Sequence, residues 1–283
     1  MKKIVIIMMA LMLFCSCTTI KEKDENDKLQ VYTSFYAMYD FAKQIGGDMA
    51  DVHLLCPTGQ EPHDFEPTAQ DMAKLSQADI FIYNGMGMEH WAEKIVQTLP
   101  STVKVIEASS FVKTDNPDPH IWLNPKNAYK QMEGIADVFI EKDTSNKDYY
   151  KKQLNDTKTL CDNLYYSLLT ARDMFKSDTI IVSHDAYSHL CDLLDIRQMP
   201  INGKDNSGEP SPQRISDIVD YIKANDIKYI FCEPLGTSEI MDTIAKDTDC
   251  EILTLDPFEG RTDGGTYSNS MTENIAKLTK ALN

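Results

Sequence analysis

Three of the six histidines and two acidic residues of this 283-residue chain lie where a metal ion could be bound. His184 directly follows a strand-like run, His63 lies in the loop after another run, and His120 ends a loop rich in Asn, Asp and Pro. Asp256 follows a further strand-like run, and Glu259 comes three residues later. In open α/β sheets, ligands bind beyond the carboxyl ends of the strands. Three imidazoles and one carboxylate gathered there could complete a tetrahedral site for Zn²⁺.

Spacing alone leaves a structural interpretation of these histidines open. No two of the six have the spacing of an HExxH helix, and His184 and His189 are five residues apart, which does not place them on one helical face. A lone histidine is more often a hydrogen-bonded structural or surface residue than a ligand. We interpret His53, His90 and His189 in that structural way.

Seven short apolar runs predict β-strands, and helical patterns with recognisable starts separate them. Thr68 with Asp71 three residues later predicts a capping-box start, and Ser211 before Pro212 predicts a second helix start. Alternating strands and helices favour parallel sheets covered by helices on both faces, so the expected fold class is α/β. The predicted strands are 29–33, 52–55, 80–83, 103–106, 179–182, 229–232 and 252–255.

One segment without Gly or Pro interrupts this alternation and extends from about Lys147 to Lys176. Its apolar residues recur at spacings of three and four, which predicts a helix of about 29 residues. The helix divides the strands into two sets, which favours two Rossmann-like α/β lobes joined by one long rigid helix. We expect the lobes at 29–145 and 178–283, with the linking helix at 146–177. A single domain that contains one long helix is the alternative.

The N-terminal sequence has the features of an exported lipoprotein. Two lysines precede an apolar run of about a dozen residues, which is shorter than the roughly 20 residues that span a bilayer. The run ends at Ser16-Cys17, which predicts a signal peptide over 1–16 and a lipid anchor on Cys17. The polar residues that follow predict a flexible tether over 17–28. An ordinary signal peptide with incidental cysteines is the alternative.

Composition excludes some functions. The formal net charge of −16 argues against nucleic acid as a partner, because phosphate binding needs clustered Lys and Arg. The acidic surface is compatible with attracting cations, and solubility explains it equally well. Five cysteines follow Cys17, and because they are odd in number and lack CxxC spacing, neither a disulfide scaffold nor a thiolate zinc site is expected.

Several motifs together resemble the metal-binding lipoproteins of ABC-type zinc and manganese importers, over nearly the whole chain after the tether. The resemblance implies two α/β lobes joined by a rigid helix, with the metal held between them. It also implies a monomer that is not an enzyme, is anchored to the membrane outside the cytoplasm, and works with an ABC permease and its ATPase. The motifs are Gly59–Pro67, Ala78–Gly85, Met88–Trp91, Asp118–Trp122 with Asn124-Pro125, His184–Tyr187, Glu209–Pro212 and Gly265–Tyr267 with Asn274.

Carried over by position, the resemblance implies that His63, His120 and His184 are metal ligands. The third position is a glutamate in members that resemble manganese binders, so a histidine there favours Zn²⁺ over Mn²⁺. For the fourth ligand the family offers two positions, which fall on Asp256 and Glu259, and we favour Glu259.

Two functions from different classes fit three histidines. A capture protein of an importer would close the fourth position with a protein carboxylate, whereas a zinc hydrolase would leave that position to water. Two carboxylates are available and no substrate-pocket chemistry is evident, which favours capture. Surface adhesion through the acidic face is compatible with capture.

Overall fold

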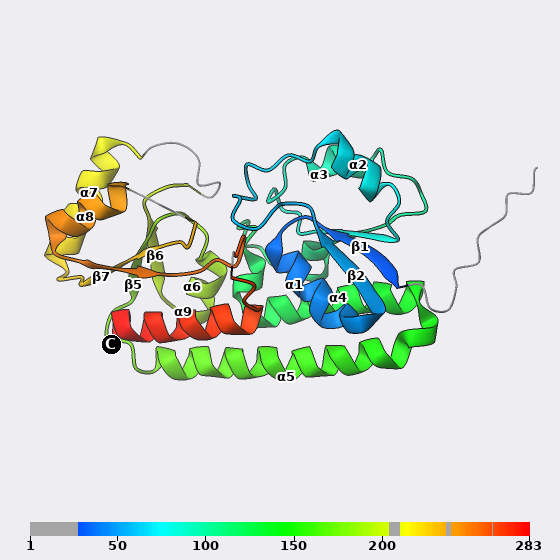
Figure 1. Ribbon diagram of the computed structural model, residues 1–283. Coiled ribbons are helices and arrows are strands. Elements are labelled where there is room, and N and C mark those ends of the chain that lie inside the picture. Colours follow the sequence, from blue (N-terminus) through cyan, green and yellow to red (C-terminus); the bar gives the residue numbers. More distant parts are fainter. Residues whose placement is uncertain (1–27, 204–209, 236–238, 262) are drawn as a thin grey trace, which may run out of the picture.

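The computed structural model describes residues 28–203, 210–235, 239–261 and 263–283, which form two parallel four-stranded sheets in two lobes (Figure 1). The first sheet has the order β2-β1-β3-β4, and the second has the order β6-β5-β7-β8. All paired strands are parallel. The strands are β1 (Leu29–Thr33), β2 (Ala50–Leu54), β3 (Ile80–Tyr83), β4 (Lys104–Glu107), β5 (Thr179–Val182), β6 (Arg197–Pro200), β7 (Tyr229–Cys232) and β8 (Glu251–Thr254). The two-lobed α/β fold expected from the sequence is therefore confirmed.

All seven predicted strands form, but the eighth strand, β6, was not predicted. Its sequence Arg-Gln-Met-Pro contains no apolar run. β6 lies at the edge of the second sheet, where a proline is tolerated because one side of the strand needs no hydrogen-bonding partner. β6 therefore forms because the tertiary structure places it beside β5, and its own sequence does not predict a strand.

The helices cover both sheets and begin at the expected capping residues. The side chain of Thr68 accepts a hydrogen bond from the amide of Asp71 in a complete capping box, and Ser211 caps the next predicted helix through the amide of Arg214. The helices are α1 (Tyr36–Gly46), α2 (Ala69–Leu75), α3 (Ala92–Val96), α4 (Pro125–Lys142), α5 (Lys147–Arg172), α6 (Ser188–Leu194), α7 (Pro212–Ala224), α8 (Glu239–Thr248) and α9 (Tyr267–Leu282).

The long helix α5 runs beneath both lobes (Figure 1). It packs against α1 and α4 of the first lobe and against α6 and α9 of the second. It has 26 residues and ends at Arg172, slightly earlier than expected. The chain leaves the helix there, and the amides of Lys176 and Ser177 both donate hydrogen bonds to the carbonyl of Leu282 at the end of α9. The helix thus connects the two lobes through contacts with helices of each.

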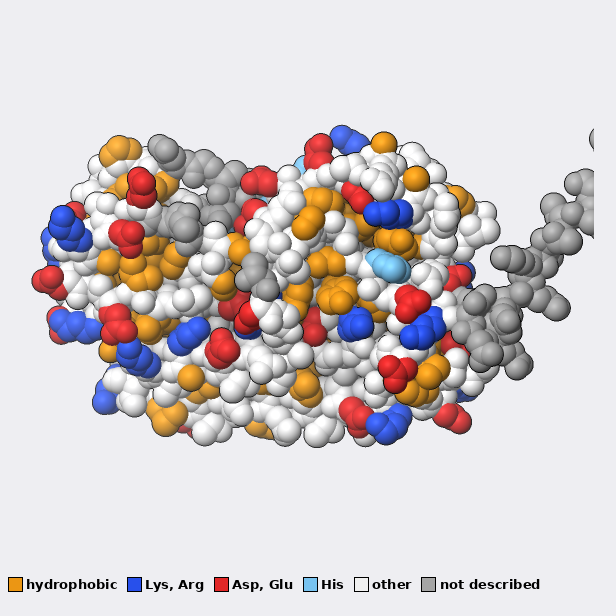
Figure 2. Space-filling view, viewed as in Figure 1, with side chains coloured by type: hydrophobic (Ala, Val, Ile, Leu, Met, Phe, Trp, Pro, Cys, Tyr) orange, Lys and Arg blue, Asp and Glu red, His pale blue; other side chains and the backbone are white. Residues whose placement is uncertain are grey.

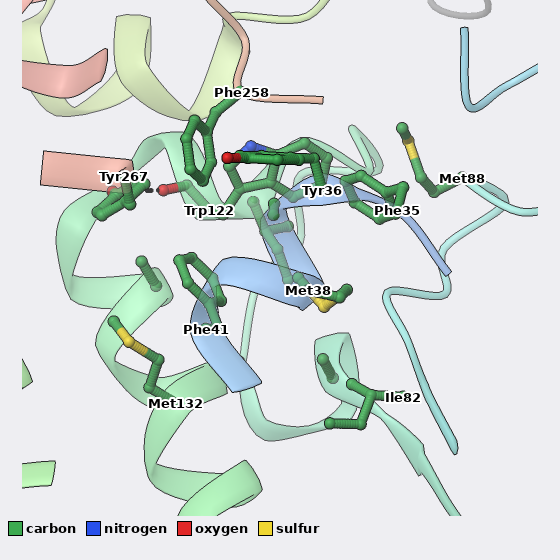
Figure 3. Close-up of a cluster of buried hydrophobic side chains, with 14 of the residues drawn as sticks. Phe35, Tyr36, Met38, Phe41, Ile82, Met88, Trp122, Met132, Phe258 and Tyr267 are labelled. Atoms are coloured by element: carbon green, nitrogen blue, oxygen red, sulfur yellow. Dashed lines mark hydrogen bonds between the residues drawn. The ribbon is translucent and has the colours of Figure 1, made fainter. Parts of the chain in front are cut away.

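The larger hydrophobic core continues from the first lobe into the second. Figure 3 shows Trp122 of the first lobe beside Phe258 and Tyr267 of the second, with Tyr36 packed against the same group. The Trp122 indole also donates a 2.7 Å hydrogen bond to the carbonyl of Pro257. A second, smaller core lies among β5, β7, α7 and α8. Because close-packed interiors resist deformation, the continuous core holds the lobes in one relative position.

The expected signal peptide at 1–16, the lipidated Cys17 and all but the last residue of the tether lie outside the described residues. Within the described part of the chain, no helix is both long and apolar enough to cross a bilayer. On the face shown in Figure 2, basic and acidic side chains are interspersed over both lobes.

Candidate metal centre

Four side chains from four separate loops meet between the lobes. His63 lies in the loop after β2, and His120 immediately precedes a short 3-10 helix in the first lobe. His184 follows β5 by two residues, and Glu259 lies in the loop after β8. All four are buried, and one ligand atom from each can be chosen so that these atoms lie within 4.8 Å of one another. Parallel strands end at a common edge, and the two sheets present these edges to each other.

The separations within this cluster suit a tetrahedral zinc ion. His63 Nε2 lies 3.3 Å from His120 Nε2, and His120 Nε2 lies 2.8 Å from Glu259 Oε1. His184 Nε2 lies 4.0 Å from the same oxygen. Zinc bonded to nitrogen at about 2.0–2.1 Å in a tetrahedron would set its ligand atoms roughly 3.3 Å apart. The observed distances bracket that value, so small side-chain rotations would complete the coordination.

A buried nitrogen without a hydrogen-bond partner also points to a site that can bind a cation. Within the described residues, His184 Nε2 has no such partner although the side chain is fully buried. Buried polar atoms in folded proteins are nearly always paired, and each exception calls for an explanation such as a bound ion. A cation held jointly by the four side chains would satisfy this nitrogen.

The loop that carries Glu259 contains an unusual turn. Phe258 has a φ of +62°, a left-handed conformation that is rare for a bulky residue. Its ring is fully buried against Tyr36 and Tyr267, and its amide donates a 2.8 Å hydrogen bond to Asp256 Oδ1. The turn therefore sends Phe258 into the core and leaves Glu259 facing the histidines.

Asp256, the other candidate for the fourth ligand, is engaged elsewhere. Its Oδ2 atom accepts hydrogen bonds from Arg261 Nη1 at 3.1 Å and from Ser270 Oγ at 2.7 Å. The group of potential ligands found among the described residues contains Glu259 and not Asp256. The geometry thus distinguishes the two acidic residues: Glu259 faces the histidines, whereas Asp256 is hydrogen-bonded to side chains of its own lobe.

Two buried carboxylates orient the histidine rings. Asp118 Oδ1 lies 2.5 Å from His120 Nδ1, and Glu233 Oε1 contacts His184 Nδ1. A hydrogen bond at one ring nitrogen fixes the tautomer and leaves the other nitrogen as the free ligand atom. In both rings that other atom is Nε2, the atom nearest the centre of the cluster.

Electrostatic coupling within the cluster shifts several pKa values in the metal-free protein. Burial alone would lower the pKa of His120, but the charge of Glu259 and the hydrogen bond to Asp118 raise it to about 10. Burial alone would raise the pKa of Glu259, but the charge and hydrogen bond of His120, with the charge of His184, lower it to about 2. The pKa of His184 is raised despite burial, by its hydrogen bond with Glu233 and the charge of that residue. Without a metal, protons on His120 and His184 therefore balance the negative charge of the neighbouring carboxylates, as a metal cation would.

Sequence reasoning missed two carboxylates near this centre. Glu233 directly follows β7, so the rule that led to His184 would also have selected it. Glu61 accepts a hydrogen bond from the amide of His63, and burial together with the charge of Glu259 raises the pKa of its carboxyl to about 8. Glu61 lines a small cavity with Glu233 and Glu259, so the outer boundary of the cluster is itself acidic.

The other three histidines lie outside the cluster. His53 is on β2, where its ring stacks on Tyr32 at a centroid distance of 4.6 Å. His90 is 55% exposed and lies near Glu66. His189 is buried in α6, and its Nε2 donates a 2.9 Å hydrogen bond to the carbonyl of Asp118.

A two-lobed α/β fold with a buried cluster of side chains that could hold a metal ion between the lobes is typical of one class of proteins, the metal-specific solute-binding proteins. Comparison with known families is consistent with this class: the family described as the periplasmic component A of zinc-uptake complexes, ZnuA, matches residues 31–281. The chain belongs to this family.

Individual relatives extend the comparison. The chain is 30% identical to the high-affinity zinc uptake system protein ZnuA of Bacillus subtilis strain 168, over 94% of this chain and 92% of that protein. It is 29% identical to the zinc-binding lipoprotein AdcA of Streptococcus pneumoniae strain R6, over 98% of this chain but only 60% of the longer relative. The crystal structure of the Zn(II)-bound ZnuA-like domain of Streptococcus pneumoniae AdcA superposes with a TM-score of 0.82 at 30% identity, covering 90% of this chain and 99% of that one.

Proposed function

We propose that this chain captures Zn²⁺ outside the cytoplasm and delivers it to the membrane permease of an ABC importer. The observation that carries the proposal is the buried cluster of His63, His120, His184 and Glu259, to which both lobes contribute. Membership of the zinc-uptake family supports the same conclusion.

The donor set favours zinc over manganese. Imidazole nitrogen suits Zn²⁺, whereas Mn²⁺ prefers sites rich in carboxylate and carbonyl oxygen. Three of the four side chains in the cluster are histidines, including His184. A bound Zn²⁺ would be held by nitrogen at three positions and by Glu259 at the fourth.

The same donor set favours capture over catalysis. A catalytic zinc site keeps one coordination position open to water, and a site closed by four protein ligands does not. Glu259 occupies the fourth position and is only 3% exposed. We therefore propose a transport role for this centre and no hydrolytic one.

We propose further that a lipid on Cys17 anchors the protein to the membrane, after a signal peptide over 1–16 is removed. The support comes from the sequence and from the description of one relative as a zinc-binding lipoprotein. The anchored chain would act as a monomer with a permease and its ATPase. Replacing Cys17 by Ala should move the protein from the membrane fraction to the soluble extracytoplasmic fraction, and an unchanged distribution would rule out Cys17 as the anchor.

Metal analysis tests the central proposal. Protein purified without added metal should contain zinc, and competition among Zn²⁺, Mn²⁺ and Fe²⁺ should favour Zn²⁺. His120→Ala should weaken zinc binding by orders of magnitude while the fold, followed by circular dichroism, is retained. His90→Ala is the matched control because this histidine is exposed and outside the cluster. Wild-type affinity in His120→Ala would remove that residue from the site.

A further inference from the structure

The two ligand histidines His120 and His184 belong to different lobes, yet zinc binding requires their nitrogens at a set distance. We infer that Asp118 is a positioning residue that ties the loop of His120 to the start of α6, four residues after His184. This inference rests on the proposed function of the site. On this inference Asp118 does not bind the metal itself but sets the distance between the metal ligands of the two lobes.

The first half of the link lies within the first lobe. Asp118 is fully buried, and its Oδ1 accepts hydrogen bonds from His120 Nδ1 at 2.5 Å and from the amide of His120 at 3.1 Å. The ring and the backbone of the histidine are therefore both fixed relative to one carboxylate oxygen.

The second half of the link crosses to the second lobe. Asp118 Oδ2 accepts hydrogen bonds from the amide of Ser188, at 3.2 Å, and from its hydroxyl. The backbone carbonyl of Asp118 accepts a third bond, from His189 Nε2, at 2.9 Å. Ser188 and His189 are the first two residues of α6, so the helix start is held by one residue of the opposite lobe.

The loop that carries Asp118 is in turn anchored to its own lobe. Asn84 Nδ2 donates a 3.0 Å hydrogen bond to the carbonyl of Pro119, and Asn84 Oδ1 accepts one from Gln131 Nε2 at 2.8 Å. Asn84 directly follows β3, and Gln131 lies on α4. The loop therefore moves with the first lobe, and the bonds of Asp118 to α6 act between the lobes.

The α6 end of the link also touches the loop of the fourth ligand. The hydroxyl of Tyr187, one residue before α6, donates a 2.7 Å hydrogen bond to the carbonyl of Leu255. Leu255 precedes the turn that presents Glu259. A displacement of the start of α6 would therefore disturb the segments that carry both His184 and Glu259.

Chemistry explains why an aspartate suits this position. A buried carboxylate is unfavourable unless hydrogen bonds satisfy it, so this side chain resists any movement that breaks one of its bonds. Asparagine keeps the shape but replaces one accepting oxygen with a donor, and so it cannot accept from both His120 and Ser188. Loss of either half of the link should loosen the metal site without removing a ligand.

The test compares zinc dissociation and the Co²⁺ absorption spectrum in wild type and variants. Partners that orient metal ligands typically contribute about 10- to 100-fold in metal affinity, so we expect Asp118→Asn to release zinc faster by a factor in that range. Ser188→Ala should release zinc about tenfold faster and weaken the visible bands of tetrahedral Co²⁺, although it touches neither metal nor ligand. Ser188→Thr retains the hydroxyl and should restore both readouts.

Asp192→Ala is the matched control. Asp192 lies on the exposed side of α6 and accepts a 2.8 Å hydrogen bond from Asn116, so its removal also breaks a bond between the lobes. This variant should keep the wild-type dissociation rate within about twofold. An equal loss in Asp192→Ala and Ser188→Ala would overturn the assignment, because any bond between the lobes would then suffice.

Other outcomes separate this inference from the proposed function. If the wild type binds zinc through its three histidines while Ser188→Ala and His189→Gln keep the wild-type rate and Co²⁺ spectrum, the role of Asp118 is refuted and capture stands. If the wild type does not bind zinc, the proposed function fails first. If Ser188→Ala lowers the melting temperature of the metal-free protein and leaves zinc release unchanged, the link is structural only and the inference is wrong.

Discussion

Zinc affinity should fall about tenfold for each unit of pH between pH 8 and pH 6, because a proton on His120 competes with the metal. Only a neutral imidazole binds a metal ion. In the metal-free protein, burial lowers the pKa of His120, but the charge of Glu259 and the hydrogen bond to Asp118 raise it to about 10. At every pH below that value the protonated form predominates, so each step to lower pH favours the proton over zinc.

The raised pKa of His120 sets the expected loss of zinc affinity. Over two pH units the proton on His120 alone should weaken zinc binding about 100-fold, or about 2.7 kcal/mol. His184 also has a raised pKa, so its proton should add to the loss toward the acidic end of the range. A histidine with the ordinary pKa of about 6.5 would instead leave the affinity almost constant between pH 8 and pH 7. The interval above pH 7 is therefore the informative one.

Two assays measure the effect independently. Competition with a chelator of known pH dependence gives the affinity at each pH. Calorimetry in buffers with different ionisation enthalpies gives the number of protons released, which should be at least about one per zinc at pH 8. Glu259→Gln is the matched variant, because removing the negative charge should lower the pKa of His120 and reduce proton release. A constant affinity from pH 8 to pH 7 together with no proton release would refute the reasoning.

Three further predictions concern the loop of the fourth ligand, a buried acid and a tight turn. Glu259→Gln should reduce zinc affinity, measured by competition with a chelator, more than Asp256→Asn does, because Glu259 faces the histidines whereas Asp256 pairs with Arg261 at 3.1 Å. The opposite order of affinities would exchange the two roles. Burial is the main cause that raises the pKa of Asp40 from 3.8 to about 6, so the ionised side chain destabilises the fold above pH 6. In urea unfolding of metal-free protein, protonation of this group should raise the free energy of unfolding by up to about 3 kcal/mol as the pH falls from 7 to 4. Asp40→Asn should lack this increase, and an equal increase in the variant and the wild type would exclude Asp40 as its source. Gly85 has a φ of +86°, and an added Cβ would clash with the carboxylate of Glu107. Gly85→Ala should therefore lower the free energy of unfolding in urea by more than about 1 kcal/mol, and an unchanged midpoint would show that the turn adapts.

Much of the fold was predictable because its signals are local. Apolar runs of four or five residues predicted seven strands, and the stripe of buried residues on α5 predicted the helix that joins the lobes. The strand β6 and the end of α5 escaped prediction for a common reason. Each is set by partners distant in sequence, β5 for the strand and Leu282 for the helix end.

For the site, the sequence by itself determined which residue types were available and on which side of the sheets they would lie. The positions of His63, His120 and His184 after strands and loops made them candidate ligands, and the resemblance to metal-binding lipoproteins supported that assignment. The resemblance favoured Glu259 over Asp256 as the fourth ligand, but residue type and spacing did not distinguish them, because the two acids have the same chemistry and lie three residues apart in one loop. Their directions depend on a left-handed residue between them and on side chains that arrive from other parts of the chain.

The supporting carboxylates show the same division. Asp118 and Glu233 are visible in the sequence as ordinary acidic residues near proline. Their roles depend on the folded structure, because Glu233 reaches His184 from the end of a different strand of the same lobe and Asp118 reaches the start of α6 from the other lobe. Such contacts require atoms from separate segments within about 3 Å. Residue type thus determined the chemistry of the centre. Only tertiary packing decided which groups face it, because the orientations of the side chains and the distances between them are fixed only when the two lobes are assembled.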